Sequence, residues 1–244
     1  MSDTDARAPE GRRSNKKRRD RTRLPKKLII IKNADKEYHE KWKPGRDLLN
    51  IPHPFRALCM GKPNSGKTLV IKNMLIRASP PFERVVVVHC DPEHTSEYDD
   101  IGAEMLGDIP PPEDWDGEHK TLCILDDLEY RRMPKDQARC LDRLVGYVST
   151  HRNVSVIITG QDPFALPVIA RRCANLLILW RSHDWSMMSQ IARKTGMTAS
   201  DFKEIFKNHM PERHDSLWVD LTRNTPAPLR KNGYDIITRA EHHI

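Results

Sequence analysis

The chain has 244 residues, long enough for one α/β domain with appendages, and its formal net charge is +7. That excess belongs to residues 1–27, which contain eleven Lys and Arg against four Asp and Glu, so the remainder is balanced at 30 basic and 30 acidic residues. Five single cysteines, no apolar run of membrane-spanning length and no secretory signal argue against a disulfide scaffold, a membrane protein or a secreted one, so we expect a soluble intracellular protein.

Residues 1–27 are polar and contain almost no large apolar side chains, so they cannot bury enough surface to fold alone. We predict a basic, disordered N-terminal arm. A block rich in Lys and Arg is typical of nuclear import signals and of nucleic-acid contact, while a solvated tail that only aids solubility is the plainer alternative. The candidate nucleic-acid contacts in this arm are Arg12, Arg13, Lys16, Lys17, Arg18 and Arg19.

Residues 28–50 are predicted to lead into the folded core. The apolar run at 28–31 indicates a strand, and Lys43-Pro-Gly-Arg indicates a turn. Tyr38 and Trp42 lie between them, where covering a sheet edge is a simpler role than packing near a nucleotide base.

Residues 56–77 are predicted to form a strand, a glycine-rich loop with the pattern G-x-x-x-x-G-K-T, and a helix. Glycines at this spacing let backbone N–H groups face a phosphate, and the helix N-terminus adds a positive dipole. Lys67 is predicted to reach the β- and γ-phosphates of ATP, and Thr68 to give its hydroxyl to Mg²⁺. The residues expected to hold the nucleotide are Gly61, Lys62, Pro63, Asn64, Ser65, Gly66, Lys67, Thr68 and Leu69.

The β-branched run at 84–89 indicates a parallel strand buried on both faces. An acidic, proline-rich connection follows, in which we expect a short helix over 96–106. The next apolar strand, from residue 121, ends in Asp126 and Asp127. A strand beside the P-loop strand is expected to deliver Asp126 to the water shell of Mg²⁺. Asp127 is the candidate base for the attacking water, Glu129 is a weaker one, and a solvated turn is the plain alternative.

Further along, an amphipathic helix is predicted over 135–149, and strands over 154–161 and 176–181. The alternation of strands and helices indicates an α/β fold of the P-loop NTPase kind, a mainly parallel, doubly wound sheet with flanking helices. Ligands of such sheets bind at the carboxyl ends of the strands, which places the glycine loop, His89 to Asp91, Asp126 and Gln161 on one rim.

The C-terminal residues 183–244 are predicted to be a small extension. We expect helices at 184–194 and 198–207, the second capped by Thr198, and a hairpin of strands 216–221 and 234–237 at the sheet edge. The domain organisation is then an arm (1–27), a lead-in (28–50), a P-loop ATPase core (51–182) and this extension (183–244).

With these motifs the chain resembles the FtsK/HerA superfamily of P-loop ATPases, and within it the virion DNA-packaging ATPases of poxvirus-like and related large DNA viruses. The resemblance covers about residues 50–210. It rests on the Walker A loop, the strand that follows Phe82, the Walker B strand and the block over 151–181. The chain departs from the superfamily pattern at Asp127, where relatives usually have Glu, and at Lys62-Pro-Asn, where they often have small residues.

The resemblance implies ATP hydrolysis, with Mg²⁺, coupled to packaging of double-stranded DNA into a capsid by a homo-oligomeric ring, a pentamer or hexamer. It implies capsid proteins as partners, no membrane, and a location at the virus assembly site, in the virion or, given the arm, in the host nucleus. An Arg of the neighbouring subunit completes such sites; Arg152 is the best positional match and Arg181 the second. Gln161 would read the γ-phosphate and relay its loss to DNA-facing loops.

Other functions remain open from the residues alone. A replication helicase or initiation NTPase would share the same motifs. In a small-molecule or nucleoside kinase Asp91 could hold a substrate, but no Arg-rich lid lies between Asp126 and Gln161. A non-catalytic P-loop protein that binds DNA or capsid would not need the intact Lys67 and Thr68.

Overall fold

The computed structural model describes residues 49–182, 184–222 and 228–238, without the side chains of residues 185 and 187. The predicted arm and nearly all of the lead-in, including its strand, Tyr38 and Trp42, lie outside these described residues.

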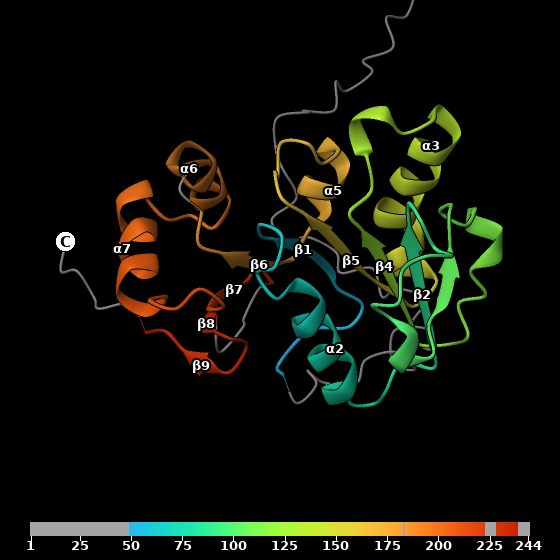
Figure 1. Cartoon of the computed structure of the whole chain (residues 1–244), viewed down its shortest axis with the longest axis horizontal. Coiled ribbons are helices and arrows are strands. Elements are labelled where there is room, and N and C mark those ends of the chain that lie inside the picture. Colours follow the sequence, from blue (N-terminus) through green and yellow to red (C-terminus); the bar gives the residue numbers. More distant parts are fainter. Residues whose placement is uncertain (1–48, 183, 223–227, 239–244) are drawn as a thin grey trace, which may run out of the picture. The chain divides into compact units, whose positions relative to one another are not determined.

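A single nine-stranded sheet organises the described part of the chain, with the strand order β3-β2-β4-β5-β1-β6-β7-β8-β9 (Figure 1). The pairs from β3 through β6 are parallel, and those from β6 through β9 are antiparallel. The predicted mainly parallel α/β sheet is therefore confirmed. The strands are β1 (Arg56–Met60), β2 (Arg84–His89), β3 (Glu104–Leu106), β4 (Thr121–Asp126), β5 (Val154–Gly160), β6 (Leu176–Trp180), β7 (Ser216–Asp220), β8 (Leu229–Lys231) and β9 (Asp235–Ile236).

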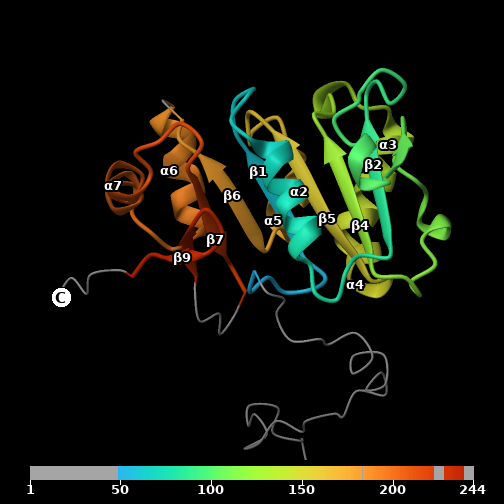
Figure 2. The same cartoon turned by 60° about the horizontal axis from the view of Figure 1, so that its bottom comes forward.

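Helices cover both faces of this sheet, α2 on one and α3, α5 and α6 on the other (Figures 1 and 2). None of the helices in the described ranges is long and apolar enough to cross a membrane. The α-helices are α2 (Lys67–Arg77), α3 (Lys135–Arg143), α4 (Ser149–His151), α5 (Val168–Cys173), α6 (Trp185–Lys194) and α7 (Ala199–His209); a π-helical turn, η4 (Leu144–Val148), joins α3 to α4, and short 3₁₀ turns are η1 (Asp99–Ile101), η2 (Pro112–Asp114) and η3 (Tyr130–Arg132).

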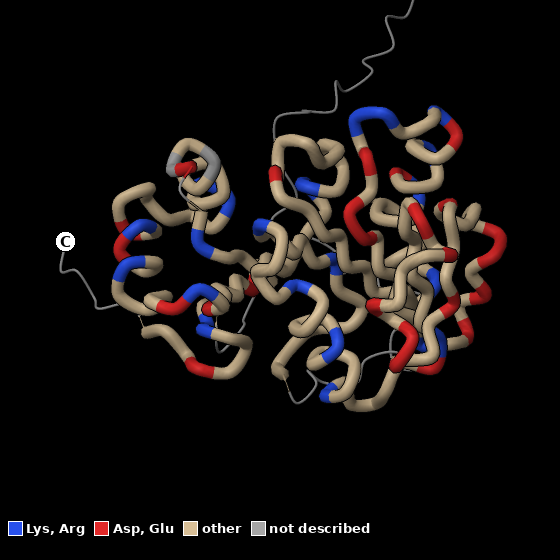
Figure 3. The backbone as a smooth tube through the Cα atoms, in the orientation of Figure 1, with Lys and Arg blue, Asp and Glu red and all other residues tan. Residues whose placement is uncertain are grey.

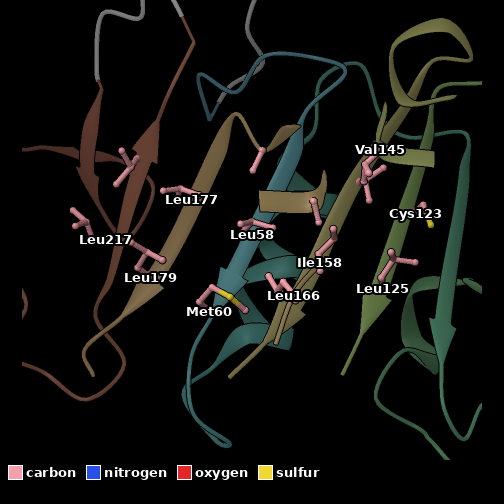
Figure 4. Packing of buried hydrophobic residues seen from close by; sticks show 14 of the residues in the cluster. Leu58, Met60, Cys123, Leu125, Val145, Ile158, Leu166, Leu177, Leu179 and Leu217 are labelled. Atoms are coloured by element: carbon pink, nitrogen blue, oxygen red, sulfur yellow. The ribbon is translucent and has the colours of Figure 1, made fainter. Parts of the chain in front are cut away.

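Alternation along the strands divides the core into two layers. In β1, Leu58 and Met60 pack toward α3, α5 and α6, whereas Ala57 and Cys59 pack toward α2. Figure 4 shows the first layer, where Met60 lies near Leu166, both beside Gly160 at the end of the neighbouring strand β5. Since both faces of the central strands are covered, the apolar residues of β1, β4, β5 and β6 are buried, whereas β2 is partly buried and the edge strand β3 has no buried residue.

The register brings the carboxyl ends of the parallel strands to one rim. Met60 at the end of β1 is opposite Gly160 of β5, and Asp126 at the end of β4 is opposite His89 of β2. One expectation was wrong: the strand that carries Asp126 does not lie beside the P-loop strand, because β5 pairs with both β1 and β4. This inserted strand supplies Thr159 to the site.

Two further expectations were wrong in detail. The short helix expected over 96–106 is reduced to the three-residue 3₁₀ turn η1, because Gly102 then adopts a left-handed conformation (φ 63°) and residues Glu104–Leu106 gain hydrogen bonds by pairing with β2. The strands predicted at 216–221 and 234–237 do not pair with each other, because β8 lies between β7 and β9. The cap of α7 is confirmed, since Thr198 Oγ1 accepts a hydrogen bond from the Asp201 N–H (3.1 Å).

A polar hydrogen-bond network connects β1 and β5 at their amino ends, opposite the rim that carries the glycine loop. His53 Nε2 lies 2.6 Å from Asn153 Oδ1, and His53 Nδ1 lies 2.8 Å from Ser155 Oγ. The Ser155 hydroxyl also accepts a hydrogen bond from the Phe55 N–H (3.1 Å). Burial lowers the pKa of His53 to about 4, against the opposing effect of its hydrogen bond to Asn153.

This network predicts a pH-dependent stability. The pKa of His53 is about 6.5 in an unfolded chain, so the unfolded state takes up the proton first as the pH falls. The free energy of unfolding therefore keeps the His53 contribution above pH 6.5 and loses it between pH 6.5 and about 4. We expect His53→Gln to be less stable than the wild type at pH 7.5, with a difference that shrinks toward pH 4 in urea titrations. His94→Gln, at an exposed site, is the control, and a pH-independent difference for His53→Gln would contradict the prediction.

Candidate active site

The glycine loop between β1 and α2 is tightly curled. Gly61 N–H donates to the Gly160 carbonyl of β5 (3.0 Å), which fixes the start of the loop at the rim. Asn64 (φ 58°) and Gly66 (φ 100°) have left-handed backbones, which turn the chain back into the helix. A Cβ atom on Gly61 would lie 2.4 Å from Ser65 Oγ, so only glycine allows this close approach.

Helix α2 begins with its backbone amides available to a ligand. Its N-cap residue, Gly66, offers no side-chain hydrogen bond, and no acidic residue lies in the first turn. The first N–H groups of a helix have no partner within the helix and carry the positive end of its dipole. An anion is the ligand that such an uncapped start favours.

The loop, the start of α2 and the ends of β2 and β4 enclose a cavity of about 510 Å³, a size typical of small-molecule sites. Lys67 is 8% exposed, and its ammonium donates to the Gly61 carbonyl (3.1 Å), so its charge lies across the loop. Seven of the nine predicted nucleotide-binding residues and both predicted acids therefore line one cavity, whereas Gly61 and Lys62 do not line it. The cavity is lined by Pro63, Asn64, Ser65, Gly66, Lys67, Thr68, Leu69, Lys72, His89, Glu97, Asp126 and Asp127.

Asp126 is a buried carboxylate held on both oxygens. Thr159 Oγ1 donates to its Oδ1 (2.7 Å), and the Tyr98 hydroxyl donates to its Oδ2 (2.9 Å). Burial, and then the nearby Asp126 charge, raise the pKa of Tyr98, so this phenol stays protonated and remains a donor. The carboxylate is thus fixed in orientation while each oxygen keeps capacity for a further contact.

Asp127 has a left-handed backbone (φ 45°), which is uncommon outside glycine and clusters at functional sites. Its N–H donates to Thr159 Oγ1 (2.9 Å), so the same hydroxyl orients two consecutive acids. The Asp127 side chain is exposed and lines the cavity. The alternative base Glu129 instead pairs with Arg132 (3.5 Å) on the surface and does not line the cavity.

The cavity suits a hard divalent cation. Thr68 and Asp126, the predicted metal residues, both line it and offer oxygen atoms, which Mg²⁺ prefers. Within the described ranges no group of three His, Cys, Asp or Glu side chains could hold a metal ion by itself. Mg²⁺ commonly takes one or two protein ligands and fills its shell with water and substrate phosphates.

The remaining predicted residues, Gln161, Arg181 and Arg152, do not line this cavity. Gln161 follows β5 at the same rim and is exposed. Arg181 lines an adjoining cavity of about 490 Å³ that also contacts Lys62 and Ser65 of the loop. Arg152 lies just before β5 begins, at the amino end of the strand and therefore on the side of the sheet away from the cavity. Its Nη1 donates to the Asp116 carbonyl (3.4 Å). Arg152 is therefore outside the site of its own chain.

Four residues that contact the site were not among the residues predicted from the sequence. Glu97 accepts from Thr68 Oγ1 (2.8 Å), and Tyr98 and Thr159 bond Asp126 as described. His214 Nδ1 lies 3.2 Å from the Ser65 carbonyl. Only Thr159 had a usable signal, since it occurs near the end of a predicted strand at the rim; the others lie in connections without a motif.

Solved structures of one kind of viral protein share the fold. The genome packaging NTPase B204 from Sulfolobus turreted icosahedral virus 2, in complex with sulfate, aligns with a TM-score of 0.55 and 17% identity, over 78% of this chain and 100% of that one. In complex with ATPγS it gives a TM-score of 0.54 and 16% identity, over 75% and 98%. The DNA-packaging ATPase B204 from Sulfolobus turreted icosahedral virus gives 0.52 and 14%, over 69% and 93%.

At such identities the likeness establishes the fold alone, which is the fold of the genome packaging NTPase B204. Membership of the FtsK/HerA superfamily stays a prediction from the sequence motifs. Neither a protein-family model nor a curated protein sequence matches the chain.

The close approach at Gly61 predicts a loss of nucleotide binding in Gly61→Ala. The added methyl group would collide with Ser65 Oγ and lie 3.0 Å from Trp180, forcing the loop open. We expect the Kd for ATPγS to rise by about 5- to 150-fold, because overpacking of this kind costs about 1–3 kcal/mol. Gly146→Ala is the control: it adds a methyl group in open space at an exposed position far along the chain from the loop, so it should leave the Kd unchanged. Equal effects of the two substitutions would contradict the prediction.

Proposed function

We propose that this chain is a Mg²⁺-dependent ATPase that packages double-stranded viral DNA into a capsid as a homo-oligomeric ring. One observation carries the proposal: the glycine loop, Lys67 and Thr68 face the buried Asp126 across a single cavity. The fold adds support, because B204, which shares it, is a genome packaging NTPase and was solved in complex with ATPγS. The poxvirus-like branch, the pentameric or hexameric ring, the capsid partners and the host nucleus, virus assembly site or virion as location belong to the same proposal.

Each residue of the site then has a task. The loop amides and Lys67 bind the phosphates, and Thr68 and Asp126 would hold Mg²⁺, which neutralises charge on the β- and γ-phosphates when bound. Asp127 accepts a proton from the water that attacks the γ-phosphorus, and its left-handed backbone helps to present the side chain to the cavity. Gln161, at the end of the strand between β1 and β4, senses whether the γ-phosphate is present.

Charge limits where DNA can bind. Residues 91–118 contain eleven Asp and Glu and no Lys or Arg. Figure 3 shows these acidic residues gathered on the side of β2 and β3. Because DNA is a polyanion, its path avoids this side of the subunit. The basic arm and the exposed arginines of η3, Arg131 and Arg132, are the contacts that we propose instead.

The central test is ATP turnover by the full chain with and without double-stranded DNA, run alongside sizing by light scattering. We expect DNA-stimulated turnover by a multimer. Lys67→Ala should lower turnover by about 10²-fold or more. Asp127→Asn should bind ATP normally but hydrolyse it about 10²–10⁴-fold more slowly. Glu129→Gln is the control for Asp127→Asn, and full turnover in Lys67→Ala would refute the proposed site. Strand separation by the wild type would favour the helicase alternative.

A second prediction separates the candidate arginines. Arg152 lies far from the cavity of its own chain, so it can act only on a neighbouring subunit, whereas Arg181 already adjoins the loop. If Arg152 acts in trans, Arg152→Ala should lose about 10³-fold in turnover. Mixing it with the inactive Lys67→Ala protein should then restore activity, since each variant supplies what the other lacks. Arg139→Ala on the surface of α3 is the control. A mixture as inactive as its components would exclude the trans role for Arg152.

A further inference from the structure

One connection of the chain contacts both residues of the proposed metal site. In the loop between β2 and β3, Glu97 accepts a hydrogen bond from Thr68 Oγ1 (2.8 Å), and the adjacent Tyr98 donates to Asp126 Oδ2 (2.9 Å). Thr68 begins the helix after the glycine loop, and Asp126 ends β4. Two consecutive residues therefore bridge the two halves of the site.

We propose that Glu97 and Tyr98 are positioning residues that orient Thr68 and Asp126 for binding of the Mg²⁺–ATP complex. The proposal rests on the proposed ATPase function and deepens it by naming residues beyond the Walker motifs. Groups that orient metal ligands through hydrogen bonds typically change metal affinity by about 10–100-fold when they are removed.

The contact of Glu97 sets the direction of the Thr68 hydroxyl. A hydroxyl group has one hydrogen to donate and two lone pairs to offer. Because the carboxylate of Glu97 takes the hydrogen, the lone pairs of Thr68 Oγ1 are directed away from Glu97 and stay available to a cation. Without Glu97, the hydroxyl could rotate and donate to other acceptors, including the ATP phosphates.

The contact of Tyr98 fixes the carboxylate of Asp126. Thr159 holds one carboxylate oxygen and Tyr98 holds the other, so rotation of the group would break a hydrogen bond. Tyr98 is 1% exposed and packs in the core layer beneath α2, so its ring is held in place and its hydroxyl stays directed at Asp126. The removal of this donor would leave one oxygen of a buried carboxylate without its partner, which is costly.

The connection is itself anchored to the site. Lys72 of α2 pairs with Asp100 (2.6 Å), three residues beyond Glu97, and the 3₁₀ turn η1 ends at Gly102 in a left-handed conformation. This pair joins the connection to the helix that carries Thr68. The position of Glu97 and Tyr98 is thus determined by α2 and β4 together.

The test measures the Kd of ATPγS, which separates binding from turnover, in Mg²⁺ and in EDTA. For the wild type we expect tighter binding with Mg²⁺. The quantity compared is the Kd in EDTA divided by the Kd in Mg²⁺. In Glu97→Ala and Tyr98→Phe this ratio should fall by about 10–100-fold. Binding in EDTA should be equal to or tighter than that of the wild type. Glu97→Gln should retain part of the ratio, because its amide oxygen still accepts from Thr68.

Two variants serve as matched controls: Glu93→Gln in the same connection and Tyr147→Phe on an exposed face should leave the ratio unchanged. Glu97 is exposed, so its variants test the proposal even if Tyr98→Phe is unstable. If the wild type binds ATPγS more tightly with Mg²⁺ and Glu97→Ala shows the same Mg²⁺ dependence, this inference is overturned and the proposed function is not. A wild type that binds ATPγS equally well with and without Mg²⁺ overturns the proposed function and this inference together.

Discussion

The site depends on how the chain buries one carboxylate, that of Asp126. A buried charge is costly unless hydrogen bonds compensate it, and here two hydroxyl groups from separate parts of the chain provide them. Thr159 reaches Asp126 because β5 lies between the P-loop strand and the Walker B strand. Tyr98 reaches it because the connection after β2 folds back under α2. The strand order and the course of that connection therefore determine the geometry of the candidate active site.

The features that could be predicted from the sequence are those encoded locally. The β-branched run at 84–89 is typical of a strand buried on both faces. The glycines at 61 and 66 indicate a phosphate loop, and the structure shows why they are needed: Gly66 has a left-handed backbone, and Gly61 lies too close to Ser65 for a Cβ atom. Parallel strands place their carboxyl ends on one rim, so the meeting of Lys67 with Asp126 also followed from the pattern.

The features that escaped prediction depend on partners distant in sequence. Tyr98 and Asp126 are separated by 28 residues and Thr159 and Asp126 by 33, and no local pattern states that they meet. The segment at 96–106 has mixed propensity, so pairing with β2 decided that Glu104–Leu106 is a strand.

The acidic connection also bears on how hydrolysis could drive DNA. On the proposed function, DNA would avoid the acidic β2–β3 side, so coupling would run through the loops that follow β4 and β5. Those loops start at Asp127, which lines the cavity, and at Gln161, which follows β5 at the same rim, and they are joined by the pair between Arg131 and Asp162 (3.3 Å). An exposed ion pair adds little stability, so it can break and re-form at small cost. Loss of the γ-phosphate, sensed at Gln161, would then be transmitted through Asp162 to Arg131. Arg131 lies outside the acidic segment 91–118, and its guanidinium suits a DNA phosphate.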